Sequence, residues 1–235
     1  MKKAPVSTRL RCETCPDRSD RVFCGLISDA KDKLGALGVH ISLSRGSVLH
    51  RQGDEPESIG IICEGQVKLS CTSNTGKCLI LRIAGPGQLL GLGAVITGKP
   101  HETTAEAITP SQVKVIPRKA LLEFMHEYPE VGCRTAETLA SECELTFLDA
   151  KRLALCTTAE SRLGRVLLDW GRSVTDGPKL QFQMALSHAE LGELAGLSRE
   201  TVTRTLASLR RRKLIDMHGA TLRIPNPSQL ENLCD

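Results

Sequence analysis

The stretch "LSHAELGELAGLSRETVTRTLASLRRRKLI", residues 186–215, decides the fold of the C-terminal part of the chain. Ser187, followed three residues later by Glu190, predicts a capping box, in which each side chain satisfies a backbone N–H group at the start of a helix. Gly196 supplies the tight turn that ends this helix, and Ser198 is typical of the cap of a second one. Two short helices joined by a turn that contains glycine predict a helix-turn-helix.

The second predicted helix carries side chains that suit contacts with DNA. In this motif its N-terminal residues enter the major groove. There arginine can donate two hydrogen bonds to guanine, and glutamate can accept one from cytosine. The residues that we predict to read base edges share one helix face: Arg199, Glu200, Thr203 and Arg204. The residues that we predict to hold backbone phosphates belong to the same segment: Ser198, Thr201, Arg210, Arg211, Arg212 and Lys213.

The charge of the chain agrees with a nucleic-acid partner. The net charge is +4 over 235 residues, but residues 199–213 alone carry six basic side chains against one acidic side chain. A short basic block on one helix is typical of a surface that binds phosphates, although a solvated helix face can look the same.

Two further segments complete the predicted C-terminal domain. "TTAE" predicts a capping box of Thr157 with Glu160, after which Leu163, Val166 and Trp170 line one face of a helix. "IDMHGATLRIP" predicts a β-hairpin that turns at His218-Gly219, so the domain is expected to be a winged helix.

Residues 38–117 read as a series of short strands. Apolar runs such as "SIGIIC", "QVKLSC", "CLILRIAG" and "QVKVIP" are separated by turns that contain glycine. Short strands at roughly ten-residue spacing predict an all-β barrel or sandwich.

A long helix is expected between the two regions. Residues 118–126 predict a short helix, and Pro129 opens a longer one that runs to about Cys156. Weakly apolar side chains in this helix recur at spacings of 4, 3, 4 and 3, which predicts a dimer seam. Its members are Leu139, Cys143, Thr146, Ala150 and Leu153. The alternative is a helix that packs only on its own domain.

The order of a glycine-punctuated β-roll, a long helix and "LSRETVTRTLASL" resembles the CRP/FNR family of bacterial transcription regulators over about residues 25–228. The resemblance implies an α+β fold with a cyclic-nucleotide-binding-like β-roll, a long dimerisation helix and a C-terminal winged helix-turn-helix. The implied divisions are a cysteine arm at 1–25, the β-roll sensor domain at 26–125, the dimerisation helix at 126–156 and the DNA-binding domain at 157–235.

The same resemblance implies the partners. Arg199, Glu200 and Arg204 match the three base-reading positions of the CRP-type recognition helix. We therefore expect a homodimer on double-stranded DNA, with TGTGA-like half-sites in an inverted repeat about one helical turn apart. RNA polymerase is the further expected partner. The chain has no transmembrane stretch of about 18 apolar residues and no signal sequence after its first lysines, so a cytoplasmic location is expected.

The resemblance also bears on small ligands. The stretch "GLGAVITGKPHETTA", residues 91–105, matches the cassette with which CRP binds cyclic AMP. Leu92 stands where that cassette has the glutamate for the ribose hydroxyl, and Glu102 stands where it has the arginine for the phosphate. A carboxylate would repel the phosphate, so we do not expect cyclic AMP; another ligand in the roll stays open. No paired histidines and no nucleophile set stand out, so we predict no enzyme activity.

The N-terminal stretch "CETCPDRSDRVFC" places Cys12, Cys15 and Cys24 in an arrangement that resembles the N-terminal cluster of FNR-type regulators, although the interval of eight residues before Cys24 is longer than is usual there. The resemblance implies an iron–sulfur cluster, such as a 4Fe–4S cluster, that senses oxygen, NO or redox state; thiolates suit soft iron. The family's fourth cysteine stands before the "IP" of a late strand, and this chain has Lys114 there. Candidates for a fourth ligand are Cys63, Cys71, Cys78, Glu13, Asp17 and Asp20, followed by Cys133 and Cys143 on the long helix. The alternatives are zinc, a thiol switch without metal, or no function.

Overall fold

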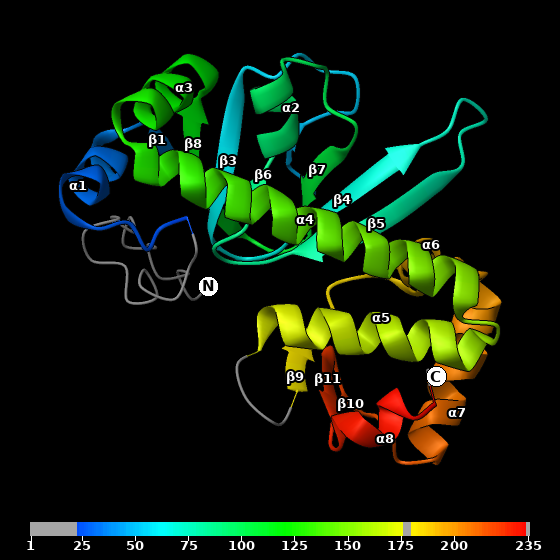
Figure 1. The fold of residues 1–235 in the computed structure, drawn as a ribbon. Coiled ribbons are helices and arrows are strands. Elements are labelled where there is room, and N and C mark those ends of the chain that lie inside the picture. The colour runs from blue at the N-terminus through cyan, green and yellow to red at the C-terminus, as the bar shows by residue number, and fades with distance from the viewer. Residues whose placement is uncertain (1–22, 176–179, 234–235) are drawn as a thin grey trace, which may run out of the picture.

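Two four-stranded antiparallel sheets build the N-terminal β-roll (Figure 1). The computed structural model describes residues 23–175 and 180–233. One sheet has the order β1-β8-β3-β6, and the other has the order β2-β7-β4-β5. The strands are β1 (Val39–Leu43), β2 (Val48–His50), β3 (Ser58–Glu64), β4 (Val67–Thr72), β5 (Cys78–Ala84), β6 (Leu89–Leu90), β7 (Thr104–Ala107) and β8 (Ser111–Pro117). The four apolar runs quoted above are β3, β4, β5 and β8, so these strand predictions are confirmed.

The roll has two apolar clusters. One joins both sheets through residues such as Ile62, Val67 and Leu90. The other holds Ile59, Ile61 and side chains from α1 (Ser28–Ala36), α2 (Leu92–Thr97) and α3 (Arg118–Glu127), so these helices pack on the roll.

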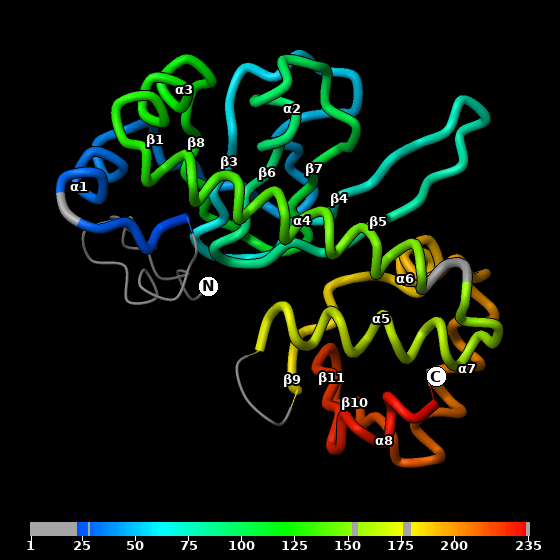
Figure 2. Tube along the Cα trace, viewed as in Figure 1, coloured from blue at the N-terminus to red at the C-terminus, as the bar shows by residue number. Residues whose placement is uncertain are grey.

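The longest helix, α4 (Pro129–Leu155), has 27 residues and lies along both domains (Figures 1 and 2). Its N-terminal part packs against the roll: Val131 is buried in the same cluster as Phe124, and Leu139 packs against that cluster. The long-helix prediction is confirmed. None of the described helices is long and apolar enough to cross a bilayer.

The C-terminal domain combines helices with a three-stranded sheet of order β10-β11-β9. Its elements are α5 (Ala159–Val174), β9 (Leu180–Gln183), α6 (His188–Ala195), α7 (Arg199–Arg211), β10 (Asp216–His218), β11 (Thr221–Ile224) and α8 (Pro227–Glu231). Trp170, Leu191 and Leu206 share its core with Ile80 and Ile83 of the roll. The apolar core is therefore continuous between the two domains.

The start of α5 corrects one sequence prediction. The N-cap is Thr158, not Thr157, and Ser161 completes the capping box in place of Glu160. Because Ser161 already bonds the cap backbone, the Glu160 carboxylate accepts hydrogen bonds from Ser208 and Arg212 at the end of α7.

Candidate nucleic-acid interface

The helix-turn-helix is built from α6 and α7, as the sequence predicts. The Ser187 hydroxyl accepts from the Glu190 N–H at 3.3 Å, and the Glu190 carboxylate accepts from the Ser187 N–H at 2.9 Å. Gly196 ends α6 in the left-handed conformation with φ of +66°, and Ser198 caps α7 by accepting from the Thr201 N–H. Both predicted caps and the glycine turn are confirmed.

The predicted base-reading residues lie together on the open face of α7. Arg199, Glu200, Thr203 and Arg204 are all exposed. The opposite face is buried through Val202, Thr205, Leu206 and Leu209. Burial of one face fixes the rotation of α7, so the four polar side chains point away from the domain core.

A histidine that the sequence analysis did not single out supports this face. His188 Nδ1 lies 2.9 Å from the Thr203 hydroxyl oxygen, which donates its only proton to the Arg199 carbonyl at 3.0 Å. His188 Nδ1–H must therefore be the donor. This contact ties the first residue of α6 to the middle of the reading face, and no local sequence signal marks it.

The start of α7 also organises Glu200 and Arg204. The Glu200 carboxylate accepts hydrogen bonds from the backbone N–H of Glu200 and from the Ser198 side chain. These bonds lower the pKa of Glu200, which favours the charged form that accepts hydrogen bonds. Arg204 Nη2 lies 3.5 Å from the Thr201 hydroxyl oxygen, so its guanidinium stays near the predicted phosphate contact.

The basic run at the end of α7 is exposed throughout. Arg212 forms an ion pair with Glu160 at 2.7 Å, so this one guanidinium is already engaged within the domain. Lys213 adopts φ of +58° and its N–H donates to the Arg210 carbonyl, which ends the helix. The hairpin that follows pairs Met217 with Leu222; it turns after His218, one residue later than predicted.

The cassette region of the roll borders a cavity of about 500 Å³ whose lining includes Glu102, Arg82 and Glu142. Leu92 is 1% exposed and belongs to the roll core, so it offers no polar group. Arg82 pairs with Glu142 of α4 at 3.3 Å. Burial raises the pKa of Glu142, and Arg82 opposes that shift.

The cysteine arm is described only from Phe23 onward, so Cys12 and Cys15 lie outside the described residues. Phe23 is fully buried in the roll cluster, and Cys24 is half-buried and packs against it. The Ile27 N–H donates to Glu130 near the start of α4 at 2.9 Å. The described end of the arm is thus anchored beside the long helix.

Lys114 takes up the position where the family resemblance places a fourth cysteine. Its side chain is 2% exposed, and its ammonium donates to the Gly35 carbonyl at the end of α1 at 3.0 Å. No group of three histidine, cysteine or acidic side chains suited to a metal occurs among residues 23–175 and 180–233. Of the three proposed cysteine ligands, only Cys24 lies within these ranges.

The structure divides the predicted dimer seam. Cys143, Thr146 and Ala150 are exposed, and the Thr146 hydroxyl donates to the Glu142 carbonyl within the helix. Leu139 instead packs against the roll cluster. The side chain of Leu153 lies outside the described residues. The exposed row of small and apolar residues on α4 consists of Cys133, Ala136, Ala140, Cys143 and Phe147.

A β-roll joined by a long helix to a helix-turn-helix domain defines a DNA-binding transcription regulator, not an enzyme. The family described as "Cyclic nucleotide-binding domain" matches residues 40–128, and the "Crp-like helix-turn-helix domain" matches residues 161–233. The Global nitrogen regulator of Synechococcus elongatus is 30% identical over 203 residues, which cover 83% of this chain and 90% of that protein. The chain belongs to the CRP/FNR family of transcription regulators.

Other relatives extend this comparison. The transcriptional activator protein Anr of Pseudomonas protegens is 27% identical over 237 residues, covering 96% of this chain and 95% of that protein. The structure of FixK2 from Bradyrhizobium japonicum matches with a TM-score of 0.75 at 22% identity, covering 85% of this chain and 98% of that one. At this identity the structural match shows the shared fold.

Proposed function

We propose that the protein binds an inverted-repeat operator as a homodimer and inserts α7 of each protomer into the major groove. The exposed, rotationally fixed face of Arg199, Glu200, Thr203 and Arg204 carries this proposal. The basic run after Arg204 would hold phosphates beside the groove, and the hairpin would lie against the neighbouring backbone. RNA polymerase is the partner that we expect at the promoter.

Selection from a library of random duplexes tests this function. We expect the full chain to enrich an inverted repeat of TGTGA-like half-sites about one helical turn apart. Enrichment of no sequence, or of a single unrepeated half-site, would contradict the proposal. Sedimentation of the protein with the enriched duplex then counts the protomers bound.

For the signal, we propose an iron–sulfur cluster held by Cys12, Cys15 and Cys24, with the fourth ligand from the cysteine and carboxylate candidates given above. The alignment with Anr supports this proposal because it extends into the cysteine arm. It leaves about 4% of the chain outside, which is fewer residues than precede Cys12. When bound, such a cluster would supply sensitivity to oxygen, NO or redox state. Phe23 and the Ile27–Glu130 contact would then transmit changes in the arm to the start of α4.

Purification without oxygen tests the sensor. We expect a visible absorption band with bound iron and sulfide, and loss of both in a Cys12→Ser/Cys15→Ser variant. A colourless protein without iron that still binds the enriched duplex would sink the cluster proposal and leave the DNA-binding proposal intact.

A second candidate is gating by a small molecule other than cyclic AMP, because a cavity of about 500 Å³ lies between the cassette and α4. In this alternative the cysteines are structural, bind zinc or act as a thiol switch. A Cys12→Ser/Cys15→Ser variant that keeps its regulated DNA binding in cells would favour it.

A further inference from the structure

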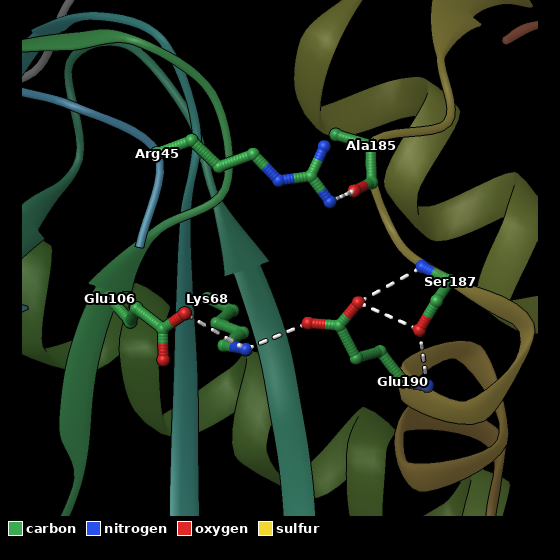
Figure 3. A network of polar contacts seen from close by, with 6 residues as sticks. All are labelled: Arg45, Lys68, Glu106, Ala185, Ser187 and Glu190. Carbon is green, nitrogen blue, oxygen red and sulfur yellow. Dashed lines mark hydrogen bonds and ion pairs between the residues drawn. The ribbon is translucent and has the colours of Figure 1, made fainter. Parts of the chain in front are cut away.

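A polar network joins the roll to the first helix of the helix-turn-helix (Figure 3). Lys68 Nζ of β4 lies 2.8 Å from Glu190 Oε1 of α6 and 3.2 Å from Glu106 Oε1 of β7. The Lys68 side chain is only 12% exposed. Beside this network, Arg45 Nη2 donates to the Ala185 carbonyl at 2.8 Å. The Lys68 ammonium is therefore shared between a carboxylate of the roll and a carboxylate of the DNA-binding domain.

Glu190 is also the capping-box residue of α6. Its Oε2 atom accepts from the Ser187 N–H and hydroxyl, both at 2.9 Å, while its Oε1 atom faces Lys68 (Figure 3). The ion pair therefore holds a side chain that is already hydrogen-bonded to the first turn of α6. Apolar packing lies alongside it, since Ile80 of β5 shares the core of Leu191 and Leu194.

The contact continues from α6 to the reading helix. His188, next to the cap, bonds the Thr203 hydroxyl of α7 at 2.9 Å. The extensive helix contacts of α7 are with α5 and α6, and its four base-reading side chains are exposed. The arrangement with Lys68 bound to Glu190 therefore leaves the reading face open to DNA.

We propose that Lys68 is a positioning residue for DNA reading, which holds α6 through Glu190 so that the roll fixes the orientation of α7. The inference rests on the proposed function. Without this ion pair the DNA-binding domain has more orientations relative to the roll. Placing both copies of α7 of a dimer on one operator then costs more conformational entropy, and this cost weakens binding.

Two substitutions with opposite charge effects test the inference. Lys68→Met removes a positive charge, and Glu190→Gln removes a negative charge while keeping an acceptor that suits a capping box. Simple attraction to DNA predicts weaker binding for Lys68→Met and tighter binding for Glu190→Gln. Positioning predicts that each weakens binding of the full chain to the selected duplex by about tenfold, and that the double variant loses little more.

Fluorescence anisotropy with the selected duplex and a scrambled duplex gives these affinities. Lys68→Arg should retain most of the wild-type affinity, and Lys119→Gln, in the exposed Lys119–Glu123 pair within α3, is the matched control without loss. Thermal unfolding of every variant shows whether the roll stays folded, and Glu190→Gln perturbs the contact without altering the roll.

Tighter binding by Glu190→Gln, or losses that multiply in the double variant, would overturn the positioning role. Failure of the wild-type chain to select any duplex would instead overturn the proposed function. The two failures are therefore distinguishable.

Discussion

Arg204 is one of the four residues that we predict to read base edges. It lies on the exposed face of α7, one turn after Glu200, with its guanidinium 3.5 Å from Thr201. A fork of donors held on a rotationally fixed helix is suited to two hydrogen bonds with one guanine.

Arg204→Ala should weaken operator binding by about 1–3 kcal/mol and relax the preference at one base pair. Binding to the selected duplex and to duplexes changed at each single position gives this pattern. An equal loss on all duplexes, with a smaller salt dependence, would instead make Arg204 a phosphate contact.

His50 and His101 form a stacked pair in the roll. Their ring centroids lie 3.7 Å apart at an interplanar angle of 7°, and His50 Nε2 is buried without a hydrogen-bond partner. Burial, and then His101, lower the pKa of His50 to about 4, although Asp54 opposes the shift. Burial also lowers the pKa of His101.

This pair predicts a loss of stability in acid. The His50 imidazole takes up a proton near pH 6.5 in the unfolded chain, but only near pH 4 in the folded chain. The free energy of unfolding should therefore be highest above pH 6.5 and fall toward pH 4. Urea unfolding at several pH values measures this slope, which His50→Phe should reduce. His126→Phe, at an exposed position of α3, should leave it unchanged; an unaltered slope in His50→Phe would count against the prediction.

Two helical glycines differ in what surrounds them. A Cβ atom on Gly192 of α6 would lie 2.5 Å from the Leu197 carbonyl oxygen, which belongs to the backbone of the turn. A Cβ atom on Gly132 of α4 would meet nothing within 4 Å. The tight packing at Gly192 brings the turn onto α6 and so sets where α7 begins.

Gly192→Ala should lower the free energy of unfolding by about 1–3 kcal/mol, because the backbone of the turn must move. Gly132→Ala is the matched control and should be neutral or stabilise by up to about 1 kcal/mol, since alanine is the better helix former. Thermal and urea unfolding measure both. Equal free energies of unfolding for the two variants would show that the backbone of the turn can move at little cost.

The exposed row on α4 makes a further prediction about assembly. Phe147 is 65% exposed and lies on the same side as Ala140 and Cys143. If this row joins two protomers, Phe147→Glu should shift the protein toward monomer, because a charge would be buried at the seam. Sedimentation velocity measures the change. Ser141→Glu, exposed on another side of α4, should leave the dimer intact; a monomer in both variants would argue against a specific seam.

Across the whole molecule, the β-roll and the helix-turn-helix domain share one apolar core and one part-buried lysine. Ile80 and Ile83 of the roll pack with the C-terminal core, and Lys68 bridges Glu106 and Glu190. Because α4 also runs beside both domains, a change at the roll has two routes to α7: the long helix and the direct contact at α6. A bistable arrangement of these contacts is what a regulator needs to respond to a signal.

The caps at Ser187 and Ser198, the turn at Gly196, the strands β3, β4, β5 and β8 and the long helix were predictable, because each depends on residues close together in the chain. The order of these elements together with the reading helix also predicted the family. The cap at Thr158 was missed by one residue, since Thr157 and Thr158 offer the same chemistry to a local pattern.

The contacts between distant segments depend on how the elements and the two domains fold against each other. Lys68 and Glu190 are 122 residues apart, and Lys114 meets Gly35 across 79 residues. The inward turn of Leu139 likewise depends on the roll beside α4 and not on the heptad spacing of the helix. Periodicity and capping report local energetics, whereas the partner of a buried charge is set by how the domains pack.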